Sequence, residues 1–200
     1  MRIPINGNHP EPRKIKRAVD ALRSGEVIAY PTDTVYGLGC DIHQKKAVDL
    51  VYQIKGMKRD QPLAFLCPDL SDIARYAVVD NNTYRILKRG TPGPFTFILN
   101  ATREVPKILM LKRKTVGIRV PAHPVAQALL RELGNPIVST SAAAGGETFN
   151  DPADIDARFG GLELVLDVDG GGLEPSTVVD LTGPDPVVAR EGLGDASLLW

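Results

Sequence analysis

The sequence contains few of the residues that build metal sites and disulfide frameworks. Among its 200 residues are two cysteines and three histidines. Cys40 and Cys67 stand in apolar or tight surroundings and lack the spacing of metal ligands. The same holds for His9, His43 and His123. We therefore expect reduced thiols in a cytoplasmic protein, histidines at the surface or in packing, and no metal site.

Net charge and long apolar runs are also missing. The 24 basic and 24 acidic residues cancel, so gross charge gives no argument for a nucleic-acid partner and any basic patch must be local. No apolar run approaches the ~20 residues that span a bilayer, and no apolar segment follows the N-terminal positive charge. The sequence predicts a globular protein without a membrane partner, built as a single domain over residues 1–200.

Short apolar runs that alternate with amphipathic segments indicate an α/β fold. The late predicted strands have no helices between them, which favours a mixed sheet, and residues 191–200 are expected to pack on the body. The predicted helices are 11–24, 44–55, 69–76, 81–88, 123–133 and 152–159. The predicted strands are 27–30, 63–67, 95–99, 116–120, 137–138, 164–168, 176–181 and 187–190.

The stretch Pro-Thr-Asp-Thr-Val-Tyr-Gly-Leu-Gly at 31–39 combines hydroxyls, a carboxylate and glycines directly after an apolar run. It can form the floor of a site for a small polar ligand or an ordinary turn from a strand to a helix. Hydroxyls also follow the apolar run before 139–141, and we expect 176–177 to end a strand in the same way. Any one of these clusters can be structural, but together they predict a polar pocket at strand ends.

Several cations have two interpretations. Arg119 lies inside the apolar run 116–120, either as an outward-facing strand residue or as a guanidinium fork for a carboxylate or phosphate; Arg190 has the same ambiguity. The basic corner of Lys55, Lys58 and Arg59 can stabilise a helix end or neutralise a polyphosphate. A second basic group consists of Lys107, Lys112, Arg113 and Lys114. The glycine-rich loops match no P-loop or dinucleotide motif, and no nucleophile elbow is present.

Taken in order, the motifs resemble the YrdC-like family of L-threonylcarbamoyladenylate synthases over residues 12–192. They are the 31–39 stretch, Pro-Gly-Pro-Phe-Thr-Phe at 92–97, Ile-Arg-Val-Pro-Ala-His-Pro at 118–124, Ser-Thr-Ser-Ala at 139–142 and Pro-Ser-Thr-Val at 175–178. The resemblance implies a twisted open mixed sheet flanked by helices, with a large concave basic surface. It also implies a nucleotidyltransferase that converts threonine, bicarbonate and ATP, with Mg²⁺ as its counter-ion, to threonylcarbamoyl-AMP and pyrophosphate. No tightly bound cofactor is implied. The product serves tRNA modification, and double-stranded RNA or tRNA is a further implied partner.

The resemblance also implies roles for individual residues. Thr34, Arg119, Ser139 and Ser176 would bind threonine, with Arg119 on its carboxylate. Lys55 and Ser141 would be catalytic. The nucleotide would be bound by Lys55, Lys58, Arg59, Thr115, Ser141 and Arg190.

Three positions depart from the synthase pattern. Met57 replaces the arginine of a Lys-x-Arg pair, Ala143 replaces the asparagine of a Ser-x-Asn pair, and Thr91 stands where a tryptophan is common. These departures resemble the YciO branch of the family. They leave two hypotheses open: an enzyme of weak or changed activity, and a non-catalytic paralogue that binds RNA or a nucleotide.

Overall fold

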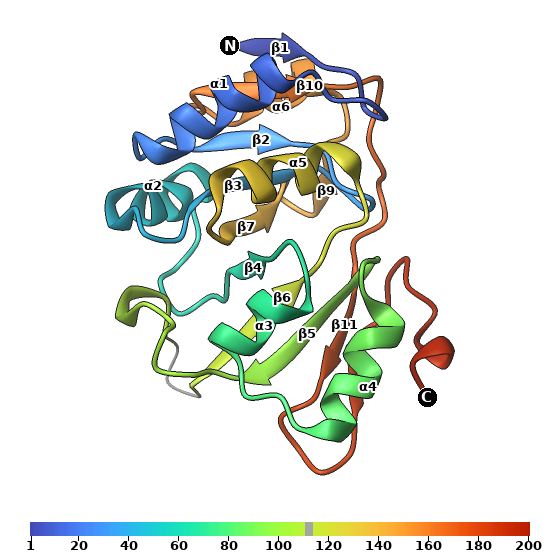
Figure 1. The fold of residues 1–200 in the computed structure, drawn as a ribbon. Coiled ribbons are helices and arrows are strands. Elements are labelled where there is room, and N and C mark those ends of the chain that lie inside the picture. The colour runs from blue at the N-terminus through green and yellow to red at the C-terminus, as the bar shows by residue number, and fades with distance from the viewer. Residues whose placement is uncertain (111–113) are drawn as a thin grey trace.

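A ten-stranded mixed sheet runs through the part of the chain that the computed structural model describes, residues 1–110 and 114–200 (Figure 1). The strand order is β1-β10-β2-β3-β7-β4-β6-β5-β11-β12, and β8 and β9 form a separate small hairpin. The strands are β1 Arg2–Pro4, β2 Ile28–Tyr30, β3 Gly37–Asp41, β4 Ala64–Leu66, β5 Phe95–Asn100, β6 Thr115–Arg119, β7 Ile137–Ser141, β8 Ala143–Ala144, β9 Glu147–Thr148, β10 Leu164–Asp167, β11 Thr177–Asp180 and β12 Val187–Arg190.

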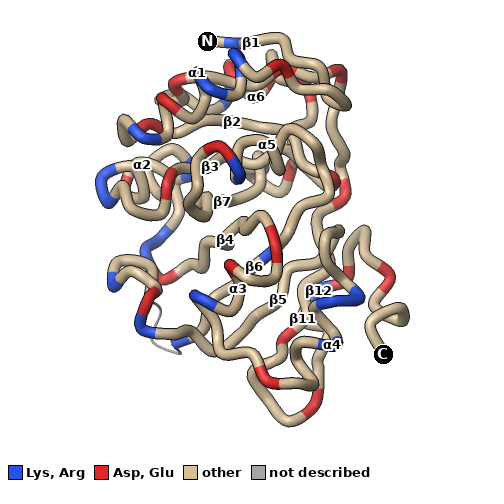
Figure 2. The backbone as a smooth tube through the Cα atoms, viewed as in Figure 1, with Lys and Arg blue, Asp and Glu red and all other residues tan. Residues whose placement is uncertain are grey.

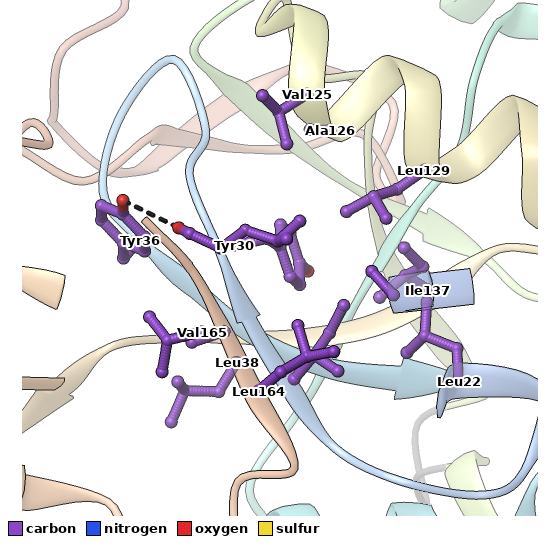
Figure 3. Close-up of a cluster of buried hydrophobic side chains, with 14 of the residues drawn as sticks. Leu22, Tyr30, Tyr36, Leu38, Val125, Ala126, Leu129, Ile137, Leu164 and Val165 are labelled. Carbon is purple, nitrogen blue, oxygen red and sulfur yellow. Dashed lines mark hydrogen bonds between the residues drawn. The ribbon is translucent and has the colours of Figure 1, made fainter. Parts of the chain in front are cut away.

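Helices cover the two faces of the sheet to different extents. They are α1 Pro12–Arg23, α2 Lys45–Lys55, α3 Leu70–Tyr76, α4 Asn81–Gly90, α5 Pro124–Leu133 and α6 Pro152–Arg158, with short 3-10 turns at Lys107–Leu109 and Ala196–Leu199. On one face, α1 and α5 pack over the β2–β3 end, where Val125 and Leu129 of α5 lie in the same apolar cluster as Leu38 and Val165 (Figure 3). On the other face, a second cluster joins α2, α3 and α4 to the central strands.

The alternation of side chains along each strand explains how the faces divide. In β4, Phe65 belongs to the α2–α4 cluster and Leu66 to the α1–α5 cluster; in β7, Val138 and Ile137 divide in the same way. Helix α5 covers only part of this face of the sheet. Over β4, β6, β5 and β11, the side chains on the α1–α5 face are not covered by α5. That uncovered part of the face is where the site lies.

The predicted mixed α/β sheet is confirmed, and each predicted helix and late strand has a counterpart within a few residues. Residues 191–200 pack on α4 through the buried Leu199. The prediction at 31–39 was wrong in one respect: the turn joins β2 to another strand, β3, and not to a helix. Strand β3 was not predicted because Gly37 and Gly39 interrupt its apolar pattern.

Both glycines are required by packing. A Cβ on Gly39 would lie 2.6 Å from Ile137 Cγ2, and one on Gly37 would lie 2.9 Å from the ring of Tyr30. The ring of Tyr30 therefore lies against the backbone of β3, and any larger residue would separate the two.

Candidate functional site

The uncovered part of the sheet face forms the floor of a cavity of about 840 Å³. One row of register partners crosses this floor: Ser139 pairs with Ala64, Ala64 with Gly117, Gly117 with Ile98, and Ile98 with Asp180. All of them line the cavity. The volume falls in the range of small-molecule sites, and the middle of the floor carries very small side chains.

The turn after β2 forms one wall of the cavity. The Thr32 hydroxyl donates to the Val35 carbonyl at 2.6 Å, and the Thr34 amide donates to Thr32 Oγ1 at 3.1 Å. Both threonines are buried and line the cavity. Thr32 Oγ1 also lies 3.1 Å from Thr34 Oγ1, and because Thr32 uses its own proton on Val35, the Thr34 hydroxyl is the donor in this contact. Both hydroxyls therefore shape the turn, and Thr34 lies at the cavity surface.

Arg119 is buried at the end of β6, with 6% of its surface exposed. Its Nη1 donates to Thr34 Oγ1 and its Nη2 to Asp33 Oδ1, both at 2.6 Å, and its Nε donates to the Gly93 carbonyl at 3.4 Å. Burial lowers the pKa of Arg119, and the Asp33 carboxylate opposes that shift. The outward-facing interpretation is therefore wrong: the guanidinium is a held, buried cation at the cavity wall.

Serine hydroxyls and a second arginine occupy other parts of the wall. Tyr30 Oη donates to Ser139 Oγ at 2.6 Å, and Ser176 Oγ lies 2.8 Å from Thr96 Oγ1. Arg190 Nη2 donates to the Ser176 carbonyl at 2.7 Å. Ser176 lies just before β11, so the prediction that this cluster ends a strand was wrong. It reaches the site because β11 runs parallel to β5 and brings its first residues to the cavity.

The basic corner is divided by the structure. Lys55 Nζ donates to the carbonyls of Ser141, at 2.7 Å, and Ala143, and it lies over the ring of Phe159. Burial, helped by the charge of Arg158, lowers the pKa of Lys55 to about 8. The ammonium thus holds the β7–β8 connection from behind, and among the described residues Lys55 is not part of the cavity lining.

The other two residues of the basic corner, Arg59 and Lys58, differ in whether they line the cavity. Arg59 pairs with Asp49, lies over the Tyr52 ring and reaches the cavity. Lys58 is exposed and is not among the described lining residues. The other predicted site residues line the cavity: Thr34, Thr115, Arg119, Ser139, Ser141, Ser176 and Arg190.

Two of the three positions that depart from the synthase pattern, Met57 and Ala143, lie beside the cavity. Met57 packs against the α2–α4 cluster, and its sulfur lies 3.8 Å from Thr140 Oγ1. Ala143 begins the β8–β9 hairpin, where its carbonyl accepts from Lys55. An apolar thioether therefore stands where the resemblance places a cation.

The lining also contains groups that the sequence did not single out. Thr96, Asp180 and Thr182 add polar atoms, and apolar side chains cover the remaining area: Leu63, Ile98, Leu109, Met110, Val116 and Val178. Those within strands were missed because the strands show ordinary alternation, and Leu63, Leu109, Met110 and Thr182 lie in connecting segments that carry no motif. Basic and acidic residues are interspersed along the visible chain (Figure 2), and a basic concave surface stays a prediction. Lys112 and Arg113 of the second basic group lie outside the described residues.

Other sequence predictions concern metals, thiols and histidines. Within 1–110 and 114–200, no group of His, Cys, Asp and Glu side chains is placed to hold a metal ion, and no helix is long and apolar enough to cross a membrane. Cys40 and Cys67 are free cysteines, and the structure places both in the buried interior. His123 accepts from the Val125 amide and caps α5, a helix-capping role that the expectation of a surface or packing residue did not specify.

With this geometry established, comparisons with known proteins identify the family. The family model Sua5_yciO_yrdC, described as "Telomere recombination", matches residues 20–192. The chain is 46% identical to YciO of Escherichia coli over 198 residues, covering 96% of this chain and 95% of that protein. It is 34% identical to threonylcarbamoyl-AMP synthase of Serratia proteamaculans, covering 82% of this chain and 90% of the synthase. The chain therefore belongs to the Sua5/YciO/YrdC family.

Solved structures agree with this assignment. The crystal structure of E. coli YciO matches with a TM-score of 0.95 and 43% identity, covering 100% of this chain and 99% of that one. Pyrococcus abyssi Sua5 complexed with L-threonine matches with a TM-score of 0.89 and 31% identity, covering 96% of this chain and 57% of that one. The resemblance of the motifs to this family and the implied fold class are thus confirmed.

Proposed function

We propose that the cavity binds threonine and a nucleotide, and that the chain joins threonine, bicarbonate and ATP into threonylcarbamoyl-AMP and pyrophosphate at a reduced rate. The observation that carries the proposal is the buried guanidinium of Arg119, held between Asp33 and Thr34 at the wall of a hydroxyl-lined cavity. A related protein, P. abyssi Sua5, is known in complex with L-threonine, and relatives with 34–37% identity are threonylcarbamoyl-AMP synthases.

The amino-acid end of the site suits an α-carboxylate and a hydroxyl. A guanidinium in a buried setting binds a carboxylate strongly, because water competes poorly there. Thr34 accepts from Arg119, and because the proton of Thr32 is used by Val35, the Thr34 hydroxyl donates to Thr32 Oγ1 at 3.1 Å. A ligand that takes the Thr34 proton would replace this contact within the turn. Ser139 of β7 and Ser176, just before β11, add hydroxyls. Together these groups would hold the carboxylate and the hydroxyl of threonine.

The nucleotide end would use Thr115, Ser141, Arg59 and Arg190, all of which line the cavity. In the reaction, the threonine amine would form a bond to the carbon of bicarbonate, which loses water to give a carbamate. A carbamate oxygen would then form a bond to the α-phosphorus of ATP, the bond from that phosphorus to the pyrophosphate would break, and pyrophosphate would leave with its charge. Mg²⁺ would enter with ATP and neutralise that charge. The protein's contribution is positioning and fixed positive charge.

The replacements at Met57 and Ala143 explain why we propose a reduced rate. Loss of one donor that stabilises developing charge typically raises a barrier by about 3 kcal/mol, or about a hundredfold in rate. Lys55 donates to backbone carbonyls, so it would act on the nucleotide only after releasing them. These observations favour a second candidate as well: a paralogue that binds RNA or a nucleotide without turnover.

The test is product formation. The chain is incubated with labelled threonine, bicarbonate and Mg²⁺–ATP, and threonylcarbamoyl-AMP is measured by mass spectrometry. Arg119→Gln should remove the product, and Arg85→Gln, on the exposed side of α4, serves as the matched control. Absence of product from folded wild-type protein would refute the enzyme. Nucleotide binding without turnover, or RNA binding that weakens steeply with salt, would then support the second candidate.

A further inference from the structure

Gly117 lies in the middle of the cavity floor without a local reason to be glycine. It is an interior residue of β6, it is partly exposed to the cavity, and its register partners are Ala64 and Ile98. A glycine inside a strand weakens it, because it has no side chain to pack and more freedom to lose on folding. Its presence therefore calls for a physical cause.

The fold itself does not supply that cause. A Cβ on Gly117 would lie 3.5 Å from Thr96 Cγ2, an ordinary van der Waals contact, and its backbone is not in the left-handed region. Gly37 and Gly39 in the neighbouring part of the sheet are different, since a Cβ there would collide with Tyr30 or Ile137. The space that a side chain at position 117 would fill is therefore part of the cavity.

The surroundings indicate what this space accepts. Ala64 and Ile98 flank the bare backbone of Gly117, and the nearest side-chain atom to a Cβ at this position is the methyl carbon of Thr96, with Val178 beside Thr96 in the cavity lining. A phosphate or carboxylate placed there would lose water to an apolar surface. A flat ring is favoured instead, because its apolar face can lie on the peptide backbone while its polar edge reaches the hydroxyls around it.

We propose that Gly117 is a specificity-determining residue that lets the nucleobase of the bound nucleotide lie directly on strand β6. The proposal rests on the proposed function, because the nucleobase belongs to the ATP of that reaction. A side chain at this position would occupy the place of the ring and leave the pockets for threonine and phosphates open.

The experiment compares wild type with Gly117→Ala and Gly117→Val. Gly160→Val is the control, since Gly160 is exposed, has no atom within 4 Å of its added Cβ and lies outside the cavity lining. Calorimetry with Mg²⁺–ATP, threonine and tripolyphosphate measures each part of the site, and thermal melts check folding. We expect ATP binding to weaken progressively from alanine to valine, by at least about tenfold for valine, with threonine and tripolyphosphate binding within about twofold of wild type.

The outcomes separate the two proposals. ATP binding that is unchanged in Gly117→Val, or that falls together with threonine and tripolyphosphate binding in folded protein, would overturn the role of Gly117 and leave the proposed function standing. Wild-type protein that binds no ATP would overturn both.

Discussion

The ion pair of Asp33 with Arg119 gives the sharpest prediction for stability. Replacing Asp33 by alanine would leave the guanidinium, whose side chain is 7% exposed, with only Thr34 and the Gly93 carbonyl as partners. Removing one partner of a buried pair costs about 3–5 kcal/mol. Because the Asp33 side chain is 17% exposed, we expect the lower end, about 3 kcal/mol, or a fall in Tm of about 6–12 °C.

Urea unfolding of wild type, Asp33→Ala, Arg119→Met and the double variant measures this cost. The double variant should be less destabilised than the sum of the single variants, because removing both partners leaves no buried unpaired charge. The matched control is the exposed pair of Arg75 and Glu104, 4.0 Å apart, where Glu104→Ala should change stability by less than about 1 kcal/mol. An Asp33→Ala variant as stable as Glu104→Ala would refute the claim that this guanidinium is a held, buried cation.

Three further predictions follow from individual residues. Gly39→Ala should destabilise the fold by about 1–3 kcal/mol in urea unfolding, because its Cβ would meet Ile137; a neutral effect would contradict the packing described for β3. The folded-state pKa of Lys55 is lowered to about 8 from 10.5, so the folded chain binds fewer protons than the unfolded chain between those values. The stability of wild type relative to Lys55→Met should therefore rise as pH increases from about 8 to about 10, and a flat difference in unfolding free energy would contradict the shift. Met57→Arg combined with Ala143→Asn should raise threonylcarbamoyl-AMP formation by at least about tenfold in the product assay, and no increase would show that these positions do not limit the rate.

Much of the fold could be predicted because periodic apolar patterns control it. The amphipathic segments became α1, α2 and α5, and the late strands without helices became part of a mixed sheet. Strand β3 could not be predicted, since its glycines are required by tertiary contacts, Gly37 with the ring of Tyr30 and Gly39 with Ile137. The local sequence pattern around β3 contains no signal of the contacts that other strands make with it.

The residue types of the candidate site could be predicted from the sequence. The directions in which its side chains point could not. Arg119 in an apolar strand allowed two interpretations, and its burial beside Asp33 excluded the outward-facing one, while its role as a guanidinium fork for a ligand stays a prediction. Lys55 reads as a free cation in the sequence, yet it holds the carbonyls of Ser141 and Ala143. Ser176 reaches the cavity from the start of β11 because of sheet order, which no motif encodes.

The central claim is that Arg119 makes the cavity a site for the carboxylate of threonine. Calorimetric titration of L-threonine into wild type, Arg119→Gln and the control Arg85→Gln tests it most directly, with melting curves to confirm folded protein. Because a hydrogen bond to a charged group contributes about 1.5–3 kcal/mol, we predict that Arg119→Gln weakens threonine binding by at least about tenfold while Arg85→Gln binds as wild type does. Equal threonine affinity with and without the Arg119 guanidinium would contradict the claim.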